Sequence, residues 1–412
     1  MSVKLSVKNL YKIFGDDPQG ALAMLRDGKS KDQILEETGM TVGVQAADFS
    51  VGEGEIFVVM GLSGSGKSTL VRMLNRLIEP TAGEVRIDGE DIVPASAEDL
   101  RRIRLNKIAM VFQHFALFPH KTVCQNVEYG LKVQGVAAPE RRERALAALD
   151  QVGLRAWADR PPHALSGGMQ QRVGLARGLA VDPQILLMDE PFSALDPLIR
   201  REMQGELLEL QRRLKMTIVF ITHDLHEALI LGDHIAIMNE GRIVQIGTAE
   251  EIVGGPANDY VAAFTQDIDR ARVFAVRRVM TEPHPLDLGA DNAQGGRERM
   301  ERLGRNALYV LDGGQLAGIV TYRDLVRAAR DGGDLAAALI RDFPSIGPEA
   351  HLHRLYELYR QGLPVAVLDE GRLVGVVEPA DLLEQLAMGG APEPGTAREA
   401  APTAAAPAAV GA

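Results

Sequence analysis

Residues 61–69 carry the side chains and glycines best suited to holding a phosphate group. They fit the P-loop pattern, in which glycines allow a tight turn and bring backbone N–H groups close to phosphate oxygens. In that pattern Lys67 reaches the β- and γ-phosphates of a nucleotide, and the Ser68 hydroxyl binds Mg²⁺. A glycine- and serine-rich surface turn could also match by chance. The predicted nucleotide-binding residues are Gly61, Ser63, Gly64, Ser65, Gly66, Lys67, Ser68 and Thr69.

The segments on either side decide between these two interpretations. Residues 55–60 form an apolar run of strand length, and residues 70–77 carry apolar side chains at helical spacing. A strand, a glycine loop and a helix in this order are the context in which a P-loop binds phosphate, and the helix adds the positive end of its dipole. We therefore predict a nucleotide site at this position.

Polar residues also end other apolar strands. Asp189 and Glu190 close the run 185–190, a placement that suits an aspartate orienting Mg²⁺ and a glutamate polarising the attacking water as general base. An Asp-Glu pair at a strand end is often only a helix cap. Gln113 and His223 end two further strands, and each taken singly could have a structural role.

A second glycine-rich segment, residues 165–170, precedes a helix and offers another anion cradle with a hydroxyl group. With this segment in place, the chain resembles the ABC ATPases, and five motifs occur in that family's order. The resemblance makes Gln113 the Q-loop, residues 193–196 the D-loop and His223 the switch histidine. It makes Ser166, Gly167, Gly168 and Gln170 the signature motif.

The resemblance implies a site shared between two chains. In this family two nucleotide domains pack head to tail, and each ATP lies between one P-loop and the partner's signature motif. One chain has one of each, so we expect a homodimer closed by ATP, with His223 holding the γ-phosphate and the water. Mg²⁺ would be bound by Ser68, Gln113 and Asp189. Phe14 matches the adenine-stacking position, with Tyr11 as the second choice.

Composition sets the broad class. The 412 residues are 46% apolar and 25% charged, as in ordinary soluble proteins, and predict two or three domains. A net charge of −11 argues against a nucleic-acid partner. The single cysteine, Cys124, has no neighbouring metal ligands, and we interpret it as a small buried residue rather than a catalytic thiol. The chain start lacks a signal-peptide pattern, so we expect a cytoplasmic protein.

Alternating strands and helices predict an α/β fold with a parallel sheet covered on both faces. We place this ATP-binding domain at residues 1–265, with a helical insert at about 16–42 and a helical subdomain at about 113–180. Residues 266–388 contain an internal repeat of roughly sixty residues, each ending in a strand followed by a helix. Residues 389–412 are rich in Ala and Pro, and we expect them to be disordered.

Nearly the whole chain resembles the ATPases of glycine betaine/L-proline importers, in residues 8–15, 31–35, 56–69, 75–81, 192–200 and 256–261. This resemblance implies ATP-driven uptake of compatible solutes, with a membrane permease and a substrate-binding protein or domain as partners. Residues 113–119 lie where such ATPases meet the permease, at the cytoplasmic face of the cell membrane. An importer of another small amine or amino acid is the alternative. A soluble ATPase of DNA repair or translation is disfavoured, because residues 69–165 contain no coiled-coil heptads and only one ATPase domain is present.

The repeat resembles a tandem CBS module, an α+β pair, and residues 318–324 match its Gly-x-x-Thr-x-x-Asp motif. Thr321 and Asp324 would then hold a ribose. The second repeat keeps Asp381 but has Glu378 in place of the hydroxyl residue, and a carboxylate there would repel a phosphate-bearing ligand. Weak nucleotide binding, an ionic-strength sensor and a dimerising module all remain open. We favour regulation over a purely structural role.

Overall fold

The computed structural model describes residues 2–113, 116–330 and 334–387. It divides into two compact units, one up to Ile268 and one from Asp269 onward, which we call the cassette unit and the C-terminal unit. The predicted disordered tail, residues 389–412, lies outside the described residues.

The cassette unit is built on a six-stranded sheet in the order β10-β9-β3-β8-β7-β6. Strands β3 and β6 to β9 run parallel, and β10 pairs antiparallel with β9. The strands are β3 (Ile56–Met60), β6 (Ile108–Val111), β7 (Ile185–Asp189), β8 (Thr217–Thr222), β9 (His234–Asn239) and β10 (Arg242–Gly247). This confirms the α/β fold with a parallel sheet. Because parallel strands share an edge at their carboxyl ends, the residues after β3, β6, β7 and β8 gather there.

Alternate residues of the central strands enter two different cores. Ile56, Val58 and Met60 belong to the core on one face of the sheet, and Phe57 and Val59 to the core on the other. This is the pattern of a sheet covered on both faces. The first core is closed by helices α5 to α9, and the second by α3, α4 and the antiparallel sheet described below.

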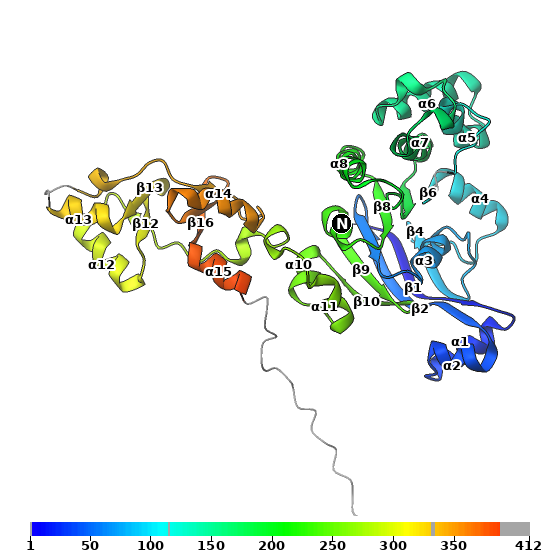
Figure 1. Cartoon of the computed structure of the whole chain (residues 1–412), viewed down its shortest axis with the longest axis horizontal. Helices are drawn as coiled ribbons and strands as arrows, with labels where there is room; N and C mark the ends of the chain where they lie inside the picture. The colour runs from blue at the N-terminus through cyan, green and yellow to red at the C-terminus, as the bar shows by residue number, and fades with distance from the viewer. Residues whose placement is uncertain (1, 114–115, 331–333, 388–412) are drawn as a thin grey trace, which may run out of the picture. The chain divides into compact units, whose positions relative to one another are not determined.

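The helices of the cassette unit alternate with its strands, as the sequence pattern predicts. They are α3 (Lys67–Leu74), α4 (Ala97–Asn106), α5 (Val123–Val133), α6 (Ala138–Gln151), α7 (Gly167–Leu179), α8 (Pro197–Leu214), α9 (Leu225–Leu231), α10 (Ala249–Gly254) and α11 (Asp259–Thr265). Figure 1 shows α5, α6 and α7 together, away from the antiparallel sheet. The segment between α6 and α7 contains two short 3-10 turns, Arg155–Trp157 and Pro162–Ala164.

A second sheet, in the order β2-β1-β4-β5, is antiparallel. Its strands are β1 (Val3–Phe14), β2 (Thr41–Gly52), β4 (Ala82–Ile87) and β5 (Glu90–Asp91). The alternating apolar and polar residues 3–8 cover only the first half of β1. Two helices, α1 (Pro18–Arg26) and α2 (Lys31–Thr38), join β1 to β2 (Figure 1). They occupy the predicted insert, where Asp17 caps α1 and Gly39 ends α2 in the left-handed region.

The C-terminal unit repeats one motif twice. Each copy has a three-stranded sheet, β11-β12-β13 or β14-β15-β16, in which a hairpin is flanked by a short parallel strand. The first copy contains β11 (Leu286–Asp287), α12 (Ala293–Leu303), β12 (Ala307–Asp312), β13 (Gln315–Thr321) and α13 (Tyr322–Arg330). The second contains β14 (Ser345–Ile346), α14 (Leu355–Leu358), β15 (Val365–Asp369), β16 (Arg372–Val377) and α15 (Pro379–Ala387). Short 3-10 turns cover Arg270–Arg272, Val276–Arg278, Leu335–Ala338, Leu352–Arg354 and Tyr359–Gln361.

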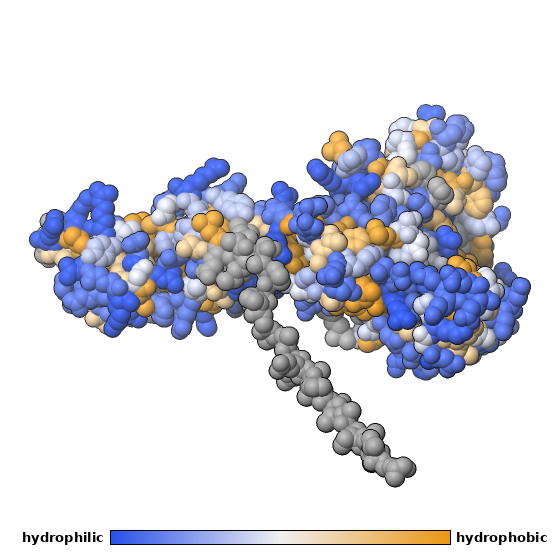
Figure 2. All heavy atoms as spheres, turned by 60° about the horizontal axis from the view of Figure 1, so that its bottom comes forward, coloured by the Kyte–Doolittle hydropathy of each residue, from blue (hydrophilic) through white to orange (hydrophobic). Residues whose placement is uncertain are grey.

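The face seen in Figure 2 is mostly hydrophilic, with smaller apolar patches between the polar side chains. Within the described part of the chain, no helix combines the length and the apolar character needed to cross a bilayer.

Candidate nucleotide-binding and hydrolysis site

The P-loop follows β3 and ends in α3, as its flanking residues predicted. Two of its glycines are required by close backbone contacts. A Cβ atom at Gly61 would lie 2.2 Å from the Met238 carbonyl oxygen, and one at Gly66 would lie 2.4 Å from that of Gly43. Both have positive φ angles, which glycine adopts without strain. Ser65 is 5% exposed, and its buried hydroxyl has no hydrogen-bond partner among the described residues.

Lys67 is the buried cation of the site. Its side chain is 4% exposed, and its Nζ atom donates to the carbonyl oxygens of Gly61 and Leu62 at 2.8 and 2.9 Å. Burial lowers the pKa of the Lys67 ammonium group, while the carboxylates of Glu190 and Asp189 act to raise it. The nearest Glu190 oxygen is 4.0 Å from Nζ. The lysine therefore lies between the P-loop and the two carboxylates that follow β7.

Ser68 and Asp189 are brought together although they lie far apart in the sequence. The Ser68 hydroxyl donates to Asp189 Oδ1 at 2.8 Å, and Arg72 Nη2 donates to Oδ2 at 3.1 Å. Two oxygen donors side by side fit Mg²⁺, which takes one or two protein ligands together with phosphates and waters. Within residues 2–113, 116–330 and 334–387, no group of three or more His, Cys, Asp or Glu side chains is placed so that it could hold a metal ion by itself. A cation at this position would need nucleotide oxygens to complete its coordination.

Glu190 and His223 face each other across neighbouring strands. His223 Nδ1 lies 3.0 Å from Glu190 Oε2, and the histidine side chain is 55% exposed. Glu190 has a φ angle of 46°, which is uncommon for a residue other than glycine. Strained backbone of this kind is concentrated at functional sites. The pair has the composition and geometry of a general base with an orienting imidazole.

Gln113, two residues beyond β6, reaches the same edge of the sheet through Ser193. Its Nε2 atom donates to the Ser193 hydroxyl at 3.2 Å, and that hydroxyl donates to the Glu190 carbonyl oxygen at 3.0 Å. The predicted metal ligand is thus linked to the backbone of Glu190 rather than to Ser68 or Asp189. Of the predicted permease-facing stretch, the structure describes Gln113 and residues 116–119.

The glycine-rich segment before α7 forms a helix N-terminus. Ser166 caps it by accepting a hydrogen bond from the backbone N–H of Met169, and Gln170 Nε2 donates to the Leu165 carbonyl oxygen. Gly167 and Ser166 are exposed, and a Cβ atom at Gly168 would meet the Ile199 side chain at 2.6 Å. Among the described residues, no hydrogen bond or ion pair joins Ser166, Gly167, Gly168 or Gln170 to Lys67, Asp189, Glu190 or His223. Backbone N–H groups at an exposed helix N-terminus can donate hydrogen bonds to an anion that is held by another chain.

Phe14 and Tyr11 differ in what surrounds them. The Phe14 side chain is 41% exposed at the end of β1, with Lys12 Nζ 4.9 Å from its ring centroid. It lies close to Gly43, where a Cβ atom would be 2.8 Å from the ring. Tyr11 instead packs against the small core of the insert, with Arg26 over its ring. Phe14 is the aromatic face that remains available for stacking.

Comparison with known proteins identifies the family. The ABC transporter family model matches residues 44–193, and the CBS domain model matches residues 276–331 and 333–388. The chain is 47% identical over 386 residues to the glycine betaine/carnitine transport ATP-binding protein GbuA of Listeria monocytogenes, covering 93% of this chain and 97% of that protein. It is 50% identical over 392 residues to the glycine betaine/proline betaine transport ATP-binding protein ProV of Salmonella typhimurium, covering 94% and 98%.

The chain belongs to the ATP-binding subunits of ABC transporters. Among solved structures, a dimeric ATP-binding cassette in a post-hydrolysis state bound to ADP and phosphate is 33% identical, with a TM-score of 0.50, and covers 59% of this chain and 98% of that one. The family confirms both the ABC ATPase and the CBS pair predicted from the motifs.

The predicted ligand residues of the CBS pair bond to each other in this ABC subunit. The Thr321 hydroxyl donates to Asp324 Oδ2 at 2.6 Å and accepts from the Asp324 backbone N–H at 3.2 Å. In the second repeat Asp381 accepts from the Glu378 backbone N–H. The Glu378 carboxylate is paired with Arg305, whose Nη1 atom lies 2.6 Å away. This pair lines a cavity of about 20 Å³, which has room for a single water rather than a nucleotide.

Several residues of the ABC site were not predicted. Arg72 lies one helical turn after Ser68, so helix spacing could have placed it near Asp189. Tyr260 gave no such signal, although its hydroxyl accepts from the Leu62 backbone N–H at 3.4 Å and donates to the Met238 carbonyl oxygen at 3.3 Å. Cys124 is fully buried, as predicted, and burial raises its pKa to about 12.

Proposed function

We propose that this chain is the ATP-hydrolysing subunit of an importer for glycine betaine, proline betaine or a similar compatible solute. The names and the nearly full-length identity of its relatives support this substrate class. The observation that carries the hydrolytic role is the contact of Glu190 with His223 at 3.0 Å, beside Lys67 and the Ser68–Asp189 pair.

In the proposed reaction, the P-loop backbone and Lys67 bind the phosphates, and Phe14 stacks on the adenine. Ser68 and Asp189 would hold Mg²⁺, with Gln113 as the third proposed ligand, and the cation would supply positive charge beside the phosphates. The Glu190 carboxylate accepts a proton from the attacking water, while His223 contacts the γ-phosphate and keeps the water in line. Burial makes Lys67 an effective counter-charge because few waters compete for it.

We propose that the working site needs two chains. Ser166, Gly167, Gly168 and Gln170 make no polar contact with the P-loop side of the described chain, and α7 presents its N-terminus outward. In a head-to-tail homodimer this N-terminus would meet the γ-phosphate bound by the partner. The dimeric cassette with ADP and phosphate supports this arrangement. Closure around ATP and opening after hydrolysis would then move a membrane permease held at the Gln113 segment.

The remaining partners follow from the proposed transport role. A permease, a substrate-binding protein or domain, and a position at the cytoplasmic face of the membrane belong to this proposal, and a nucleic-acid partner does not. We propose that residues 266–388 regulate the ATPase. The partly buried Arg305–Glu378 pair favours a response to ionic strength, since charge screening weakens an ion pair.

Reconstitution of the chain with its proposed membrane permease tests the transport role. Glycine betaine or proline betaine is expected to stimulate ATP hydrolysis, whereas stimulation only by another amine would move the chain to a different substrate. Titrating salt against the ATPase rate, with and without residues 269–412, tests the regulatory role. An identical salt response after truncation would remove it.

A further inference from the structure

Two polar contacts join α8 to the start of α9. Arg200 and Gln204, one helical turn apart on α8, face Asp224 and Glu227. Arg200 Nη1 donates to Asp224 Oδ2 at 3.3 Å, and Gln204 Nε2 donates to Glu227 Oε1 at 3.0 Å. Gln204 and Glu227 are each 5% exposed. Because unpaired polar groups are costly in such a place, these contacts fix the start of α9 against α8.

The residues on both sides of His223 are held by this network. The Thr222 hydroxyl hydrogen-bonds to the Glu227 carboxylate and accepts from the Asp224 backbone N–H at 3.0 Å. Asp224 Oδ1 caps α9 by accepting from the backbone N–H of His226 at 2.9 Å. The backbone that carries the His223 ring therefore has its position set from α8.

Arg200 also contacts the loop that leads away from Glu190. Its Nη2 atom donates to the Leu195 carbonyl oxygen at 3.3 Å, and Ser193 in the same loop donates to the Glu190 carbonyl oxygen. One guanidinium group thus bridges the segment after Glu190 and the segment after His223. A guanidinium offers several donors in a fixed fork, which the single ammonium of lysine does not.

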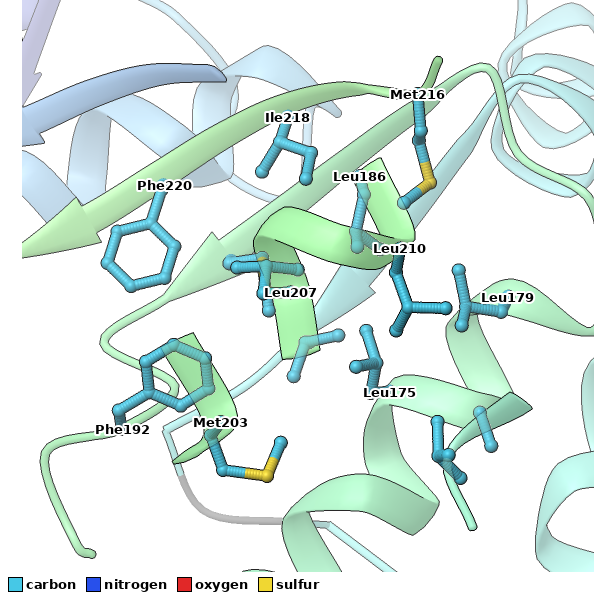
Figure 3. Packing of buried hydrophobic residues seen from close by; sticks show 14 of the residues in the cluster. Leu175, Leu179, Leu186, Phe192, Met203, Leu207, Leu210, Met216, Ile218 and Phe220 are labelled. Atoms are coloured by element: carbon cyan, nitrogen blue, oxygen red, sulfur yellow. The ribbon is translucent and has the colours of Figure 1, made fainter. Parts of the chain in front are cut away.

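The apolar side of α8 gives this bridge a firm base. Met203, Leu207 and Leu210 point from α8 toward side chains of β7 and β8, with Phe192 and Phe220 nearby (Figure 3). The rings of Phe192 and Phe220 have centroids 5.5 Å apart. Close packing of this kind leaves the helix little freedom to move relative to the sheet.

We propose that Arg200 is a positioning residue for ATP hydrolysis, holding residues 193–196 and the His223 segment at a fixed separation so that Glu190 and His223 meet. The inference rests on the proposed roles of those two residues. The simpler alternative is that Arg200 only ties α8 to α9, in which case its loss would lower stability without changing the chemistry of folded protein.

The test compares Arg200→Gln and Arg200→Lys with Arg201→Gln, a neighbouring exposed arginine, in the full-length chain. ATPase kinetics and thermal unfolding are measured for each. Because a misplacement of about 1 Å can cost roughly 100-fold in rate, we expect Arg200→Gln to lower kcat about tenfold, with KM for ATP within about twofold. Arg200→Lys should fall between Arg200→Gln and the unchanged chain. A lower Tm with an unchanged kcat, or the same kcat loss in Arg201→Gln, would overturn the proposal.

A double variant tests whether the bridge acts as a unit. Asp224→Asn keeps the helix cap but removes the charge that Arg200 contacts. Arg200→Gln with Asp224→Asn should lose no more activity than Arg200→Gln alone, and additive losses would contradict a shared role. Glu190→Gln and His223→Ala are measured alongside. If Glu190→Gln and His223→Ala both keep full ATPase turnover, the proposed catalytic roles and this inference are overturned together. If both variants lose turnover while the Arg200 variants remain normal, only this inference is overturned.

Discussion

His223 Nδ1 lies 3.0 Å from Glu190 Oε2, although the two residues are 33 positions apart in the chain. They meet because β7 and β8 are adjacent and parallel in the sheet, so their carboxyl ends lie side by side. The contact leaves the other ring nitrogen of the histidine free to face a phosphate. It also orients the carboxylate that we propose as the base.

Replacing the carboxylate should separate binding from chemistry. We expect Glu190→Gln to bind ATP with nearly unchanged affinity but to lower kcat about 100-fold or more, the usual contribution of a general base. The measurements are nucleotide titration and steady-state ATPase. Glu143→Gln, which changes an exposed glutamate on α6, is the matched control. Normal turnover in Glu190→Gln would remove this residue as the base.

The signature segment allows a test of dimer closure that spares the fold. Aspartate and asparagine are both good N-cap residues, so Ser166→Asp and Ser166→Asn should each keep α7 intact. Only the aspartate places a negative charge against the partner's γ-phosphate. We expect Ser166→Asp to abolish ATP-dependent dimerisation in light scattering while monomer binding of ATP persists. Equal dimerisation of the two variants would contradict the head-to-tail site.

Phe14 should contribute to affinity rather than to rate. Stacking of a base on an aromatic ring is worth about 1–3 kcal/mol, so Phe14→Ala is expected to weaken ATP binding about tenfold with little change in kcat. Phe14→Trp should restore the affinity. Tyr11→Leu, which removes the ring but keeps a large apolar side chain against the insert, should leave ATP binding unchanged. Fluorescence titration of a nucleotide measures each case, and a Tyr11-dependent affinity would transfer the role to that ring.

The strands, the helices and the motif residues at strand ends could be predicted because they depend on local pattern. Residues 56–60 and 218–221 are apolar throughout, which marks buried strands whatever their neighbours are. It is harder to predict which motifs lie side by side, because the sheet order β3-β8-β7-β6 differs from the order along the chain. The contact of Gln113 with Ser193 follows from this order and that of Tyr260 with Leu62 from the position of α11, and no local pattern indicates either one.

The antiparallel sheet illustrates a second limit of prediction from the sequence. Strand β2 contains the charged residue Asp48 and three glycine or alanine positions near its middle, so its period-2 pattern is weak. It forms because β1 pairs with it along nearly its whole length. Similarly, Glu378 alone predicts repulsion of a phosphate, and only the fold reveals that Arg305, from the other repeat, is its partner.

Glu227 predicts a stability effect whose sign depends on pH. Burial raises the pKa of its carboxyl group, and the hydrogen bonds from Thr222 and Gln204 only partly oppose this shift. A raised pKa in the folded state means that folding binds a proton, so stability is lost as pH rises through the window above the ordinary glutamate value. Glu227→Gln should therefore gain in Tm relative to the unchanged chain as the pH rises above the ordinary glutamate pKa. A growing loss with rising pH in calorimetry would contradict the assignment.

The Arg305–Glu378 pair should make the C-terminal unit sensitive to salt. It links the two repeats, both side chains are less than one-quarter exposed, and Arg305 also donates to the Thr281 hydroxyl at 3.2 Å. A partly buried pair of this kind is worth about 1 kcal/mol at low ionic strength, and screening reduces that value as the Debye length falls. We expect the coupling energy from a cycle of Arg305→Gln and Glu378→Gln to shrink between about 0.05 and 0.5 M salt. The more exposed pair Arg297–Glu301, within α12, provides the comparison for general salt effects. If the Arg305–Glu378 coupling is constant over this range, this pair cannot underlie a response to ionic strength.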